Sequence, residues 1–189
     1  MAAAATSARM TTEELLAMPE NGMDRWLIRG QLREQPMTVR NRYHSRIMVR
    51  VGQLLLEWLD RQPAPRGQVL GGEVGVVLKH DPDTTVGIDV AYVSAEVAAR
   101  IPDDSTLVEG APVLAVEILS PSDKQEDVHD KITEYLEAGV ALIWIVDPAD
   151  HTVRVYRPGA RPQLFNEYQE LTGEPHLPGF RVAVRRLFE

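Results

Sequence analysis

The amino-acid sequence predicts an α/β protein of the mixed α+β kind, in which helices flank a central mixed β-sheet. Short apolar runs rich in branched residues occur at 86–93, 113–119 and 140–146, and such runs are typical of buried strands. Amphipathic patterns at helical spacing span 42–60 and 122–139, which indicates two helices with one inward face each. Strands and helices in this alternation are expected to form a sheet covered by helices.

The N-terminal part of the chain predicts a short helix, a hairpin and the longest helix. Residues 11–14 (TTEE) form a capping sequence, so a short helix should end near Pro19. Residues 25–32 alternate enough for an antiparallel strand or hairpin, and Pro36 ends it. The helix over 42–60 has a core stripe at helical spacing. Its members are Tyr43, Ile47, Val51, Leu54, Leu55 and Trp58.

The stretch from residue 68 to residue 110 predicts two strands and their connections. Residues 68–78 form a glycine-interrupted strand or hairpin, and residues 86–93 form another strand. A helical turn is expected at 95–100, followed by a polar loop at 102–110.

The central unit, from residue 111 to residue 148, predicts strand, turn, helix and strand. The strand at 113–119 ends at Ser120-Pro121, and Ser122 is expected to cap the helix, with Glu126 strengthening its start. The strand at 140–146 follows the helix. The helix residues expected to face inward are Val128, Ile132, Tyr135, Leu136 and Gly139, and Lys131 lies on the same stripe.

The C-terminal part predicts only short elements. Residues 152–156 and 163–166 are expected to form short antiparallel strands, and residues 171–178 a loop. A last strand is expected at 180–184, after which residues 185–189 trail off.

Composition limits the kinds of site that the protein can carry. The 189 residues suit one domain with a real core. There is no cysteine, which excludes disulfides, thiolate metal sites and cysteine nucleophiles. No segment approaches the roughly 20 apolar residues that span a membrane, and we expect a cytoplasmic protein without a membrane partner.

The charge of the chain is unevenly distributed. The net charge of −8 argues mildly against a large nucleic-acid surface. Between residues 25 and 66, however, nine arginines stand against three acids. An acidic protein with one basic side and buried carboxylates fits a metal-dependent enzyme that acts on a phosphate substrate.

Two acids interrupt apolar strands, and a lysine on the following helix faces them. Asp89 lies between Ile88 and Val90, and Glu117 lies inside the strand at 113–119. A buried carboxylate is costly unless it is paired, so Glu117 and Lys131 can simply form a structural ion pair. Alternatively, two neighbouring carboxylates repel each other and a divalent cation relieves this best. That pattern fits phosphodiester hydrolysis by metal-activated water, with the lysine stabilising charge.

Other candidate residues have both a structural and a functional interpretation. Glu73 can face solvent or join an acidic site. Asp127 precedes Lys131 by one helical turn and can orient it or form a surface pair. His44, beside the core stripe, can be packed or can support catalysis. A row of arginines on the longest helix can be a solvated face or a nucleic-acid-binding edge. Its members are Arg42, Arg46 and Arg50.

The sequence resembles the Uma family of restriction-type endonucleases, within the PD-(D/E)XK nuclease superfamily. The residues that carry the resemblance are IDVAYV at 88–93, VEILSPS at 116–122, Asp127 with Lys131 and Tyr135, and the stretch from Gly139-Val140 to WIVDP at 144–148. The resemblance covers roughly residues 20–185 and is strongest at 113–148.

The resemblance implies a restriction-endonuclease-like fold and a Mg²⁺ (or Mn²⁺) dependent endonuclease acting on nucleic acid, in the first place DNA. It carries over Asp89 and Glu117 as metal ligands and Lys131 as the catalytic lysine. From the residues themselves we expect a tail and short helix at 1–20 and a single domain at 21–189, which the resemblance makes nuclease-like. A homodimer is expected by analogy with restriction-type enzymes. The alternative is a nuclease-fold protein that binds nucleic acid or a partner without cutting it, and another small phosphate hydrolase also remains open.

The sequence departs from the superfamily and family patterns at several positions. The superfamily lysine follows its acid by two residues, where this chain has Leu119, so the lysine has moved to the helix; Lys131 is favoured over the more exposed Lys124. The proline that usually precedes the first strand acid is replaced by Ile88. Near the N-terminus, where the family favours glutamate, glycine and glutamate, the chain has Trp26, Gly30 and Gln31.

Overall fold

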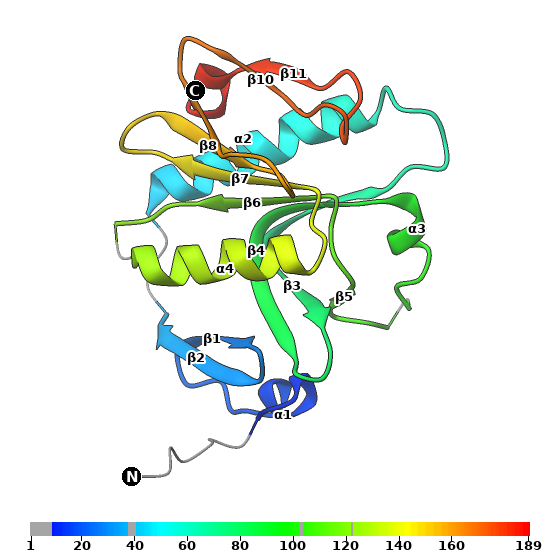
Figure 1. The fold of residues 1–189 in the computed structure, drawn as a ribbon, viewed down its shortest axis with the longest axis vertical. Helices are drawn as coiled ribbons and strands as arrows, with labels where there is room; N and C mark the ends of the chain where they lie inside the picture. Colours follow the sequence, from blue (N-terminus) through cyan, green and yellow to red (C-terminus); the bar gives the residue numbers. More distant parts are fainter. Residues whose placement is uncertain (1–8, 38–40, 103, 122) are drawn as a thin grey trace.

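The computed structural model describes residues 9–37, 41–102, 104–121 and 123–189. Within these ranges nine strands form one mixed sheet in the order β2-β1-β4-β6-β7-β8-β9, with β3 paired to β4 and β5 paired to β3 (Figure 1). The strands are β1 (Met23–Ile28), β2 (Gln31–Pro36), β3 (Gln68–Lys79), β4 (Thr84–Val93), β5 (Val108–Glu109), β6 (Leu114–Ile118), β7 (Leu142–Asp147), β8 (Thr152–Tyr156) and β9 (Gln163–Asn166). The parallel pairs are β6 with β7 and β3 with β5. The α/β prediction with a mixed, helix-flanked sheet is therefore confirmed.

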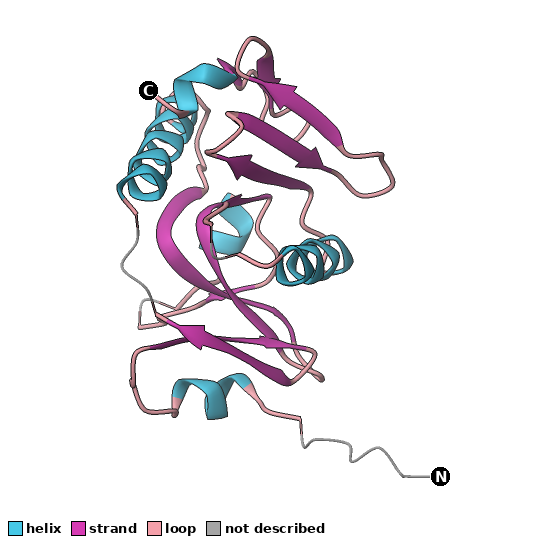
Figure 2. Ribbon diagram, turned by 90° about the vertical axis from the view of Figure 1, so that its left-hand side faces the viewer, coloured by secondary structure: helices cyan, strands magenta, loops and turns pink. Residues whose placement is uncertain are grey.

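Two long helices lie on opposite sides of this sheet, as Figure 2 shows. The helices are α1 (Thr12–Leu16), α2 (Arg42–Leu59), α3 (Ala95–Ala98), α4 (Gln125–Glu137) and a C-terminal 3₁₀ turn, η1 (Val184–Leu187). The inward residues of α2 join one buried apolar cluster and those of α4 join the other. None of the helices in the described ranges is long and apolar enough to cross a membrane.

Strand β4 is the branch point of the sheet, since it pairs with β1, β3 and β6. It pairs with β3 along most of its length, and this ladder shifts register between Gly71 and Val74. Gly72 and Glu73 both have positive φ at this bulge, 91° and 61°. A bulge bends its strand and re-aims nearby side chains, and here it lies beside the pocket described below.

The central elements follow the predicted pattern closely. The apolar runs at 86–93, 113–119 and 140–146 become β4, β6 and β7, and residues 68–78 become the single strand β3. Helix α4 begins at Gln125, and the residue before it, Lys124, provides no side-chain cap. The predicted capping residue, Ser122, lies outside the described residues.

Several local predictions are wrong, each at the end of an element. The first buried position of α2 is His44, whereas Tyr43 is 49% exposed, because the inward stripe reaches back from Ile47 by three residues and not four. Gly139 is exposed and has a φ of 90°, which places it after the helix end, where glycine is favoured.

The C-terminal region is more ordered than predicted. Residues 185–189 do not trail off, because η1 buries Leu187 and the next residue, Phe188, is also buried. A separate two-stranded sheet, β10 (Glu170–Thr172) with β11 (Arg181–Ala183), extends into the predicted loop at 171–178. Strand β5 likewise lies within the predicted loop at 102–110.

Candidate active site

The three predicted catalytic side chains come from three neighbouring elements and line the same pocket. Asp89 lies on β4, Glu117 on β6 and Lys131 on α4. The antiparallel ladder between β4 and β6 ends at the pair Val90 and Val116, and Asp89 and Glu117 are the next residue on each strand. The open pocket has a volume of about 770 Å³, within the range of small-molecule and cofactor sites. The sheet register and the following helix therefore bring these residues together.

Asp89 is held firmly through one of its two carboxylate oxygens. It is 6% exposed, and its Oδ2 accepts hydrogen bonds from the backbone N–H of Ile118 at 2.7 Å and from His44 Nε2 at 3.2 Å. Among the described residues no hydrogen bond reaches Oδ1. A carboxylate oriented in this way keeps one oxygen for a further ligand in the pocket.

Glu117 accepts a hydrogen bond on each of its carboxylate oxygens. Lys131 Nζ lies 3.0 Å from Oε2, and the Tyr135 hydroxyl lies 2.5 Å from Oε1. Lys131 also donates to the carbonyl of Gly87 on β4, at 3.2 Å. The ammonium group thus bridges β4 and β6, and the inward direction predicted for Lys131 is confirmed.

Burial and charge set the protonation of this cluster. Burial raises the pKa of Glu117, and nearby Asp89 raises it further, against the opposing effects of Lys131 and Tyr135. Burial by itself lowers the pKa of Lys131, but the attraction of Glu117 and Asp89 outweighs this and the net pKa is raised. Burial and Glu117 hold the pKa of Tyr135 well above its usual range. At neutral pH Lys131 is therefore an ammonium and Tyr135 a hydrogen-bond donor.

The donor set in the pocket fits one kind of metal better than others. The described residues contain no cluster of three or more histidine, aspartate or glutamate side chains that could hold a metal ion, so a closed protein cage is not formed there. Two oxygen donors, Asp89 and Glu117, remain. Mg²⁺ often takes one or two protein carboxylates and completes its shell with water and substrate phosphate, so these two residues fit Mg²⁺ or Mn²⁺ and not a structural zinc site.

The predicted supporting residues line the same pocket, with different contacts. His44 donates to Asp89, and its buried Nδ1 has no partner among the described residues. Glu73 is exposed on the β3 bulge. Asp127 lines the pocket, but no hydrogen bond or ion pair joins it to Lys131 within the described residues. Instead a third carboxylate, that of Asp123 in the segment before α4, also raises the pKa of Lys131, after Glu117 and Asp89.

The family model for Uma2, described as "Putative restriction endonuclease", matches residues 12–185. The chain belongs to the Uma2 family. A solved structure with a similar fold is described as a "putative nuclease belonging to DUF820" from Anabaena variabilis ATCC 29413; it is 22% identical, has a TM-score of 0.78, and is aligned over 93% of this chain and 96% of that chain. No curated protein matches the chain.

The arginine row of this Uma2 family member lies outside the pocket lining. Arg46 donates to the carbonyl of Phe188 at 2.6 Å, and Arg50 donates to the carbonyl of Glu189 at 3.2 Å. Arg42 donates to the hydroxyl of Tyr43 and lies over its ring. Two of the three arginines thus hold the C-terminal segment against α2, and their binding to nucleic acid stays a prediction.

Two polar contacts of the Uma2 site were missed by sequence reasoning. Tyr135 is predicted as an inward residue and as part of the family resemblance, but without a hydrogen bond to Glu117, although its place one turn after Lys131 puts both on the same helix face. The Gly87 carbonyl carries no side-chain signal. Of the three departures near the N-terminus, Trp26 lines the pocket, whereas Gly30 lies in the turn between β1 and β2 and Gln31 is exposed.

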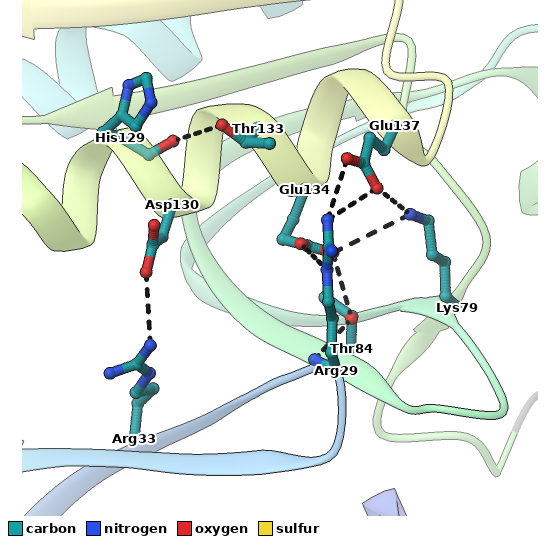
Figure 3. A network of polar contacts seen from close by, with 9 residues as sticks. All are labelled: Arg29, Arg33, Lys79, Thr84, His129, Asp130, Thr133, Glu134 and Glu137. Atoms are coloured by element: carbon teal, nitrogen blue, oxygen red, sulfur yellow. Dashed lines mark hydrogen bonds and ion pairs between the residues drawn. The ribbon is translucent and has the colours of Figure 1, made fainter.

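A second polar network fixes α4, the helix that carries Lys131 (Figure 3). Arg29, in the turn after β1, donates to Glu134 at 2.6 Å and to Glu137 at 2.9 Å. Lys79 at the end of β3 donates to Glu137 at 3.1 Å, and Thr84 donates to Glu134 at 3.4 Å. Glu134 is only 3% exposed, so its partners are needed to offset the cost of burial. The network anchors the C-terminal half of α4 to the N-terminal hairpin and to β3 and β4.

Proposed function

We propose that this Uma2 family member is a metal-dependent endonuclease that hydrolyses phosphodiester bonds, in the first place in DNA. In this proposal Asp89 and Glu117 hold Mg²⁺ or Mn²⁺, Lys131 is the catalytic cation, and His44, Glu73 and Asp127 support the site. The observation that carries it is the meeting of the two carboxylates and the lysine in one pocket, where Asp89 Oδ1 accepts no hydrogen bond from any described residue.

Each residue has a role that follows from its contacts. The Ile118 N–H and His44 orient Asp89, which reduces the freedom that it would lose on binding a cation. Tyr135 likewise orients Glu117. Because Lys131 is protonated, we assign it to stabilising negative charge on the phosphate, and not to taking a proton from water.

The proposed reaction consumes one water molecule. The water oxygen forms a bond to phosphorus, and the bond between phosphorus and the leaving sugar oxygen breaks with its electron pair. The leaving oxygen gains a proton, the water loses one, and the products are an alcohol and a phosphate monoester. When bound, the divalent cation would supply positive charge to the phosphate oxygens and make the attacking water more acidic. Lys131 would stabilise the additional negative charge of the transition state.

A second candidate function is binding of nucleic acid without cleavage. The contacts of Glu117 favour it, since both carboxylate oxygens already accept hydrogen bonds, from Lys131 and Tyr135. A pair of this kind is also what a structural ion pair between helix and sheet requires. Metal binding distinguishes the two functions, because only the first needs a cation at Glu117.

Calorimetry with Mn²⁺ tests the metal site directly. The wild type should bind one cation, and Glu117→Gln, which keeps the side-chain shape but removes the charge, should lose that binding. Glu170→Gln is the matched control, because it removes an exposed carboxylate that pairs with Arg181 on the separate small sheet. A wild type that stays folded, binds no cation and does not cut single-stranded or duplex DNA in Mg²⁺ or Mn²⁺ would refute the endonuclease and leave the binding function.

The wider organisation is part of the same proposal. We propose that residues 1–20 form a tail with a short helix and that residues 21–189 form a single nuclease-like domain. A homodimer is proposed by analogy with enzymes that cut two strands. Sedimentation of the purified chain, with and without Mg²⁺ and DNA, measures the oligomeric state.

A further inference from the structure

The candidate active-site pocket has an apolar wall facing the N-terminal side of the molecule. The wall is formed by α1, β1 and the segment after β2. Two of its side chains are among the most exposed large apolar groups of the described residues, namely Leu16 at 58% and Met37 at 62%. Its members are Leu15, Leu16, Met18, Met23, Trp26 and Met37. An exposed apolar surface that continues into a polar cleft indicates a ligand-binding surface.

Trp26 is the aromatic member of this wall. Its ring is partly buried against the core cluster on the α4 side of the sheet. Its indole Nε1 has no hydrogen-bond partner among the described residues, and it is not among the nitrogens that are buried without a partner, His44 Nδ1 and Trp144 Nε1. Trp26 is thus a partly exposed aromatic residue that lines the pocket and whose indole donor is not buried.

Among the described residues, three cationic side chains line the pocket, namely Arg25, Lys124 and Lys131. Arg25 lines the pocket, but its guanidinium donates to Glu34, Asn21 and the carbonyl of Pro19. The arginines of α2 do not line the pocket, and two of them, Arg46 and Arg50, donate to the C-terminal segment. A duplex is held mainly by many phosphate contacts, whereas a single strand is held by stacking of bases on aromatic side chains with fewer ionic contacts.

We infer that the apolar wall is a nucleobase subsite, with one base held against Trp26 while its phosphate lies at Asp89, Glu117 and Lys131. A paired base inside a duplex cannot present its face to a wall of this kind. The substrate class is therefore single-stranded DNA, or DNA with an unpaired nucleotide at the cut. This inference rests on the proposed function, since it uses the carboxylate and lysine cluster to place the phosphate.

Binding of a fluorescein-labelled single strand, measured by anisotropy in Mg²⁺, tests the subsite. Phosphorothioate linkages, which resist hydrolysis, keep the strand intact, and the blunt duplex of the same sequence is measured in parallel. The variants are Trp26→Leu, which keeps an apolar wall without a ring, and Trp26→Phe, which keeps a smaller ring. Tyr168→Leu is the matched control, because Tyr168 is an aromatic residue outside the pocket with 88% exposure.

The wild-type chain also carries an internal probe. The other two tryptophans, Trp58 and Trp144, are 6% and 1% exposed, so quenching of tryptophan fluorescence by the bound strand should come mainly from Trp26. This quenching should be absent in Trp26→Leu and present in Tyr168→Leu.

The expected result is wild-type binding to the single strand about tenfold tighter than to the duplex. Trp26→Leu should lose about tenfold in single-strand affinity, the order expected for one stacked base, while Trp26→Phe and Tyr168→Leu stay close to wild type. Equal or tighter duplex binding, unchanged affinity in a folded Trp26→Leu, or no binding of the single strand would each overturn the subsite.

Cleavage of the unmodified strand separates this inference from the proposed function. A wild type that binds through Trp26 and never cleaves would support the base subsite and refute the nuclease. A wild type that cleaves duplex, together with a Trp26→Leu variant that cleaves it equally well, would support the nuclease and overturn the base subsite.

Discussion

Replacing Lys131 by methionine should weaken both the fold and the activity, by amounts that the contacts of its ammonium group determine. The substitution keeps the length of the side chain and removes the partner of Glu117 at 3.0 Å and of the Gly87 carbonyl at 3.2 Å. Breaking a fully buried ion pair costs about 3–5 kcal/mol. Lys131 and Glu117 retain 22% and 14% side-chain exposure, so we expect about 2 kcal/mol, since water and Tyr135 still solvate the carboxylate.

Chemical unfolding of a double-mutant cycle measures this energy. At this chain length, about 2 kcal/mol corresponds to a decrease in Tm of about 4–8 °C. Glu117→Gln alone should also destabilise the protein, because it removes the negative charge that pairs with Lys131 and leaves the Gly87 carbonyl as the unchanged partner of the ammonium group. The double variant should be more stable than the sum of the single effects allows, by about 1 kcal/mol.

Activity provides the second readout of the same cycle. If Lys131 stabilises the transition state, kcat of Lys131→Met should fall by about 10²–10³-fold, while the double variant is no more active than either single one. A coupling energy below about 0.5 kcal/mol would refute the ion pair as a contributor to stability. Unchanged cleavage by a folded Lys131→Met would refute its catalytic role.

Three further predictions concern the surroundings of the pair. His44→Ala should reduce Mn²⁺ affinity by about 10–100-fold, as is typical when a residue that orients a metal ligand is lost. His44→Asn should recover part of this affinity, because its amide can donate to Asp89. Calorimetry measures both, and equal Mn²⁺ affinities in the wild type and the two variants would contradict the role of His44 in orienting Asp89. Because the pKa of Glu117 is raised, its contribution to the stability of the metal-free protein is present below the ordinary glutamate pKa and lost as the pH rises through the raised pKa. Mn²⁺ affinity should rise over the same pH range, because the ionised carboxylate binds the cation. Calorimetry and unfolding at several pH values should therefore show affinity rising while the stability of the metal-free protein falls. Affinity and stability that change in the same direction with pH would exclude Glu117 as the titrating group. Arg46→Met should cost about 1 kcal/mol by removing its bond to the Phe188 carbonyl and leave single-strand affinity unchanged in anisotropy titrations, whereas a fall in affinity would instead support the predicted phosphate contact.

Local sequence patterns were sufficient to predict the elements that carry the site. The branched apolar runs specify β4, β6 and β7 because a strand buried on both faces excludes most polar residues. The acids that interrupt two of these runs were visible for the same reason. Lys131 was assigned to the inner face of α4 from helical spacing alone, and its bond to Glu117 spans only 14 residues.

The parts that the sequence did not reveal depend on long-range contacts. His44 and Asp89 are 45 residues apart, and periodicity places His44 only beside a core stripe. In the first turn of α2 the spacing back from Ile47 allows an inward residue either three or four positions earlier, and the sequence alone does not decide between them. This is why Tyr43 is predicted in the core although the structure places His44 there. The 3₁₀ turn at the C-terminus is too short for a periodic signal, and its burial depends on α2 and on the stacking of His151 against Phe188.

Two sets of contacts made by α4 link the proposed catalytic cluster to the proposed base subsite. Lys131 and Tyr135 bind Glu117, whereas the buried Glu134 binds Arg29 in the turn after β1. The strand before that turn carries Trp26. The apolar wall and Lys131 are therefore both connected to α4, so we expect the position of this helix to affect the base on the wall and its phosphate at Lys131 together. We therefore expect loss of the Arg29–Glu134 contact to affect both the wall and Lys131, although Arg29 does not line the pocket.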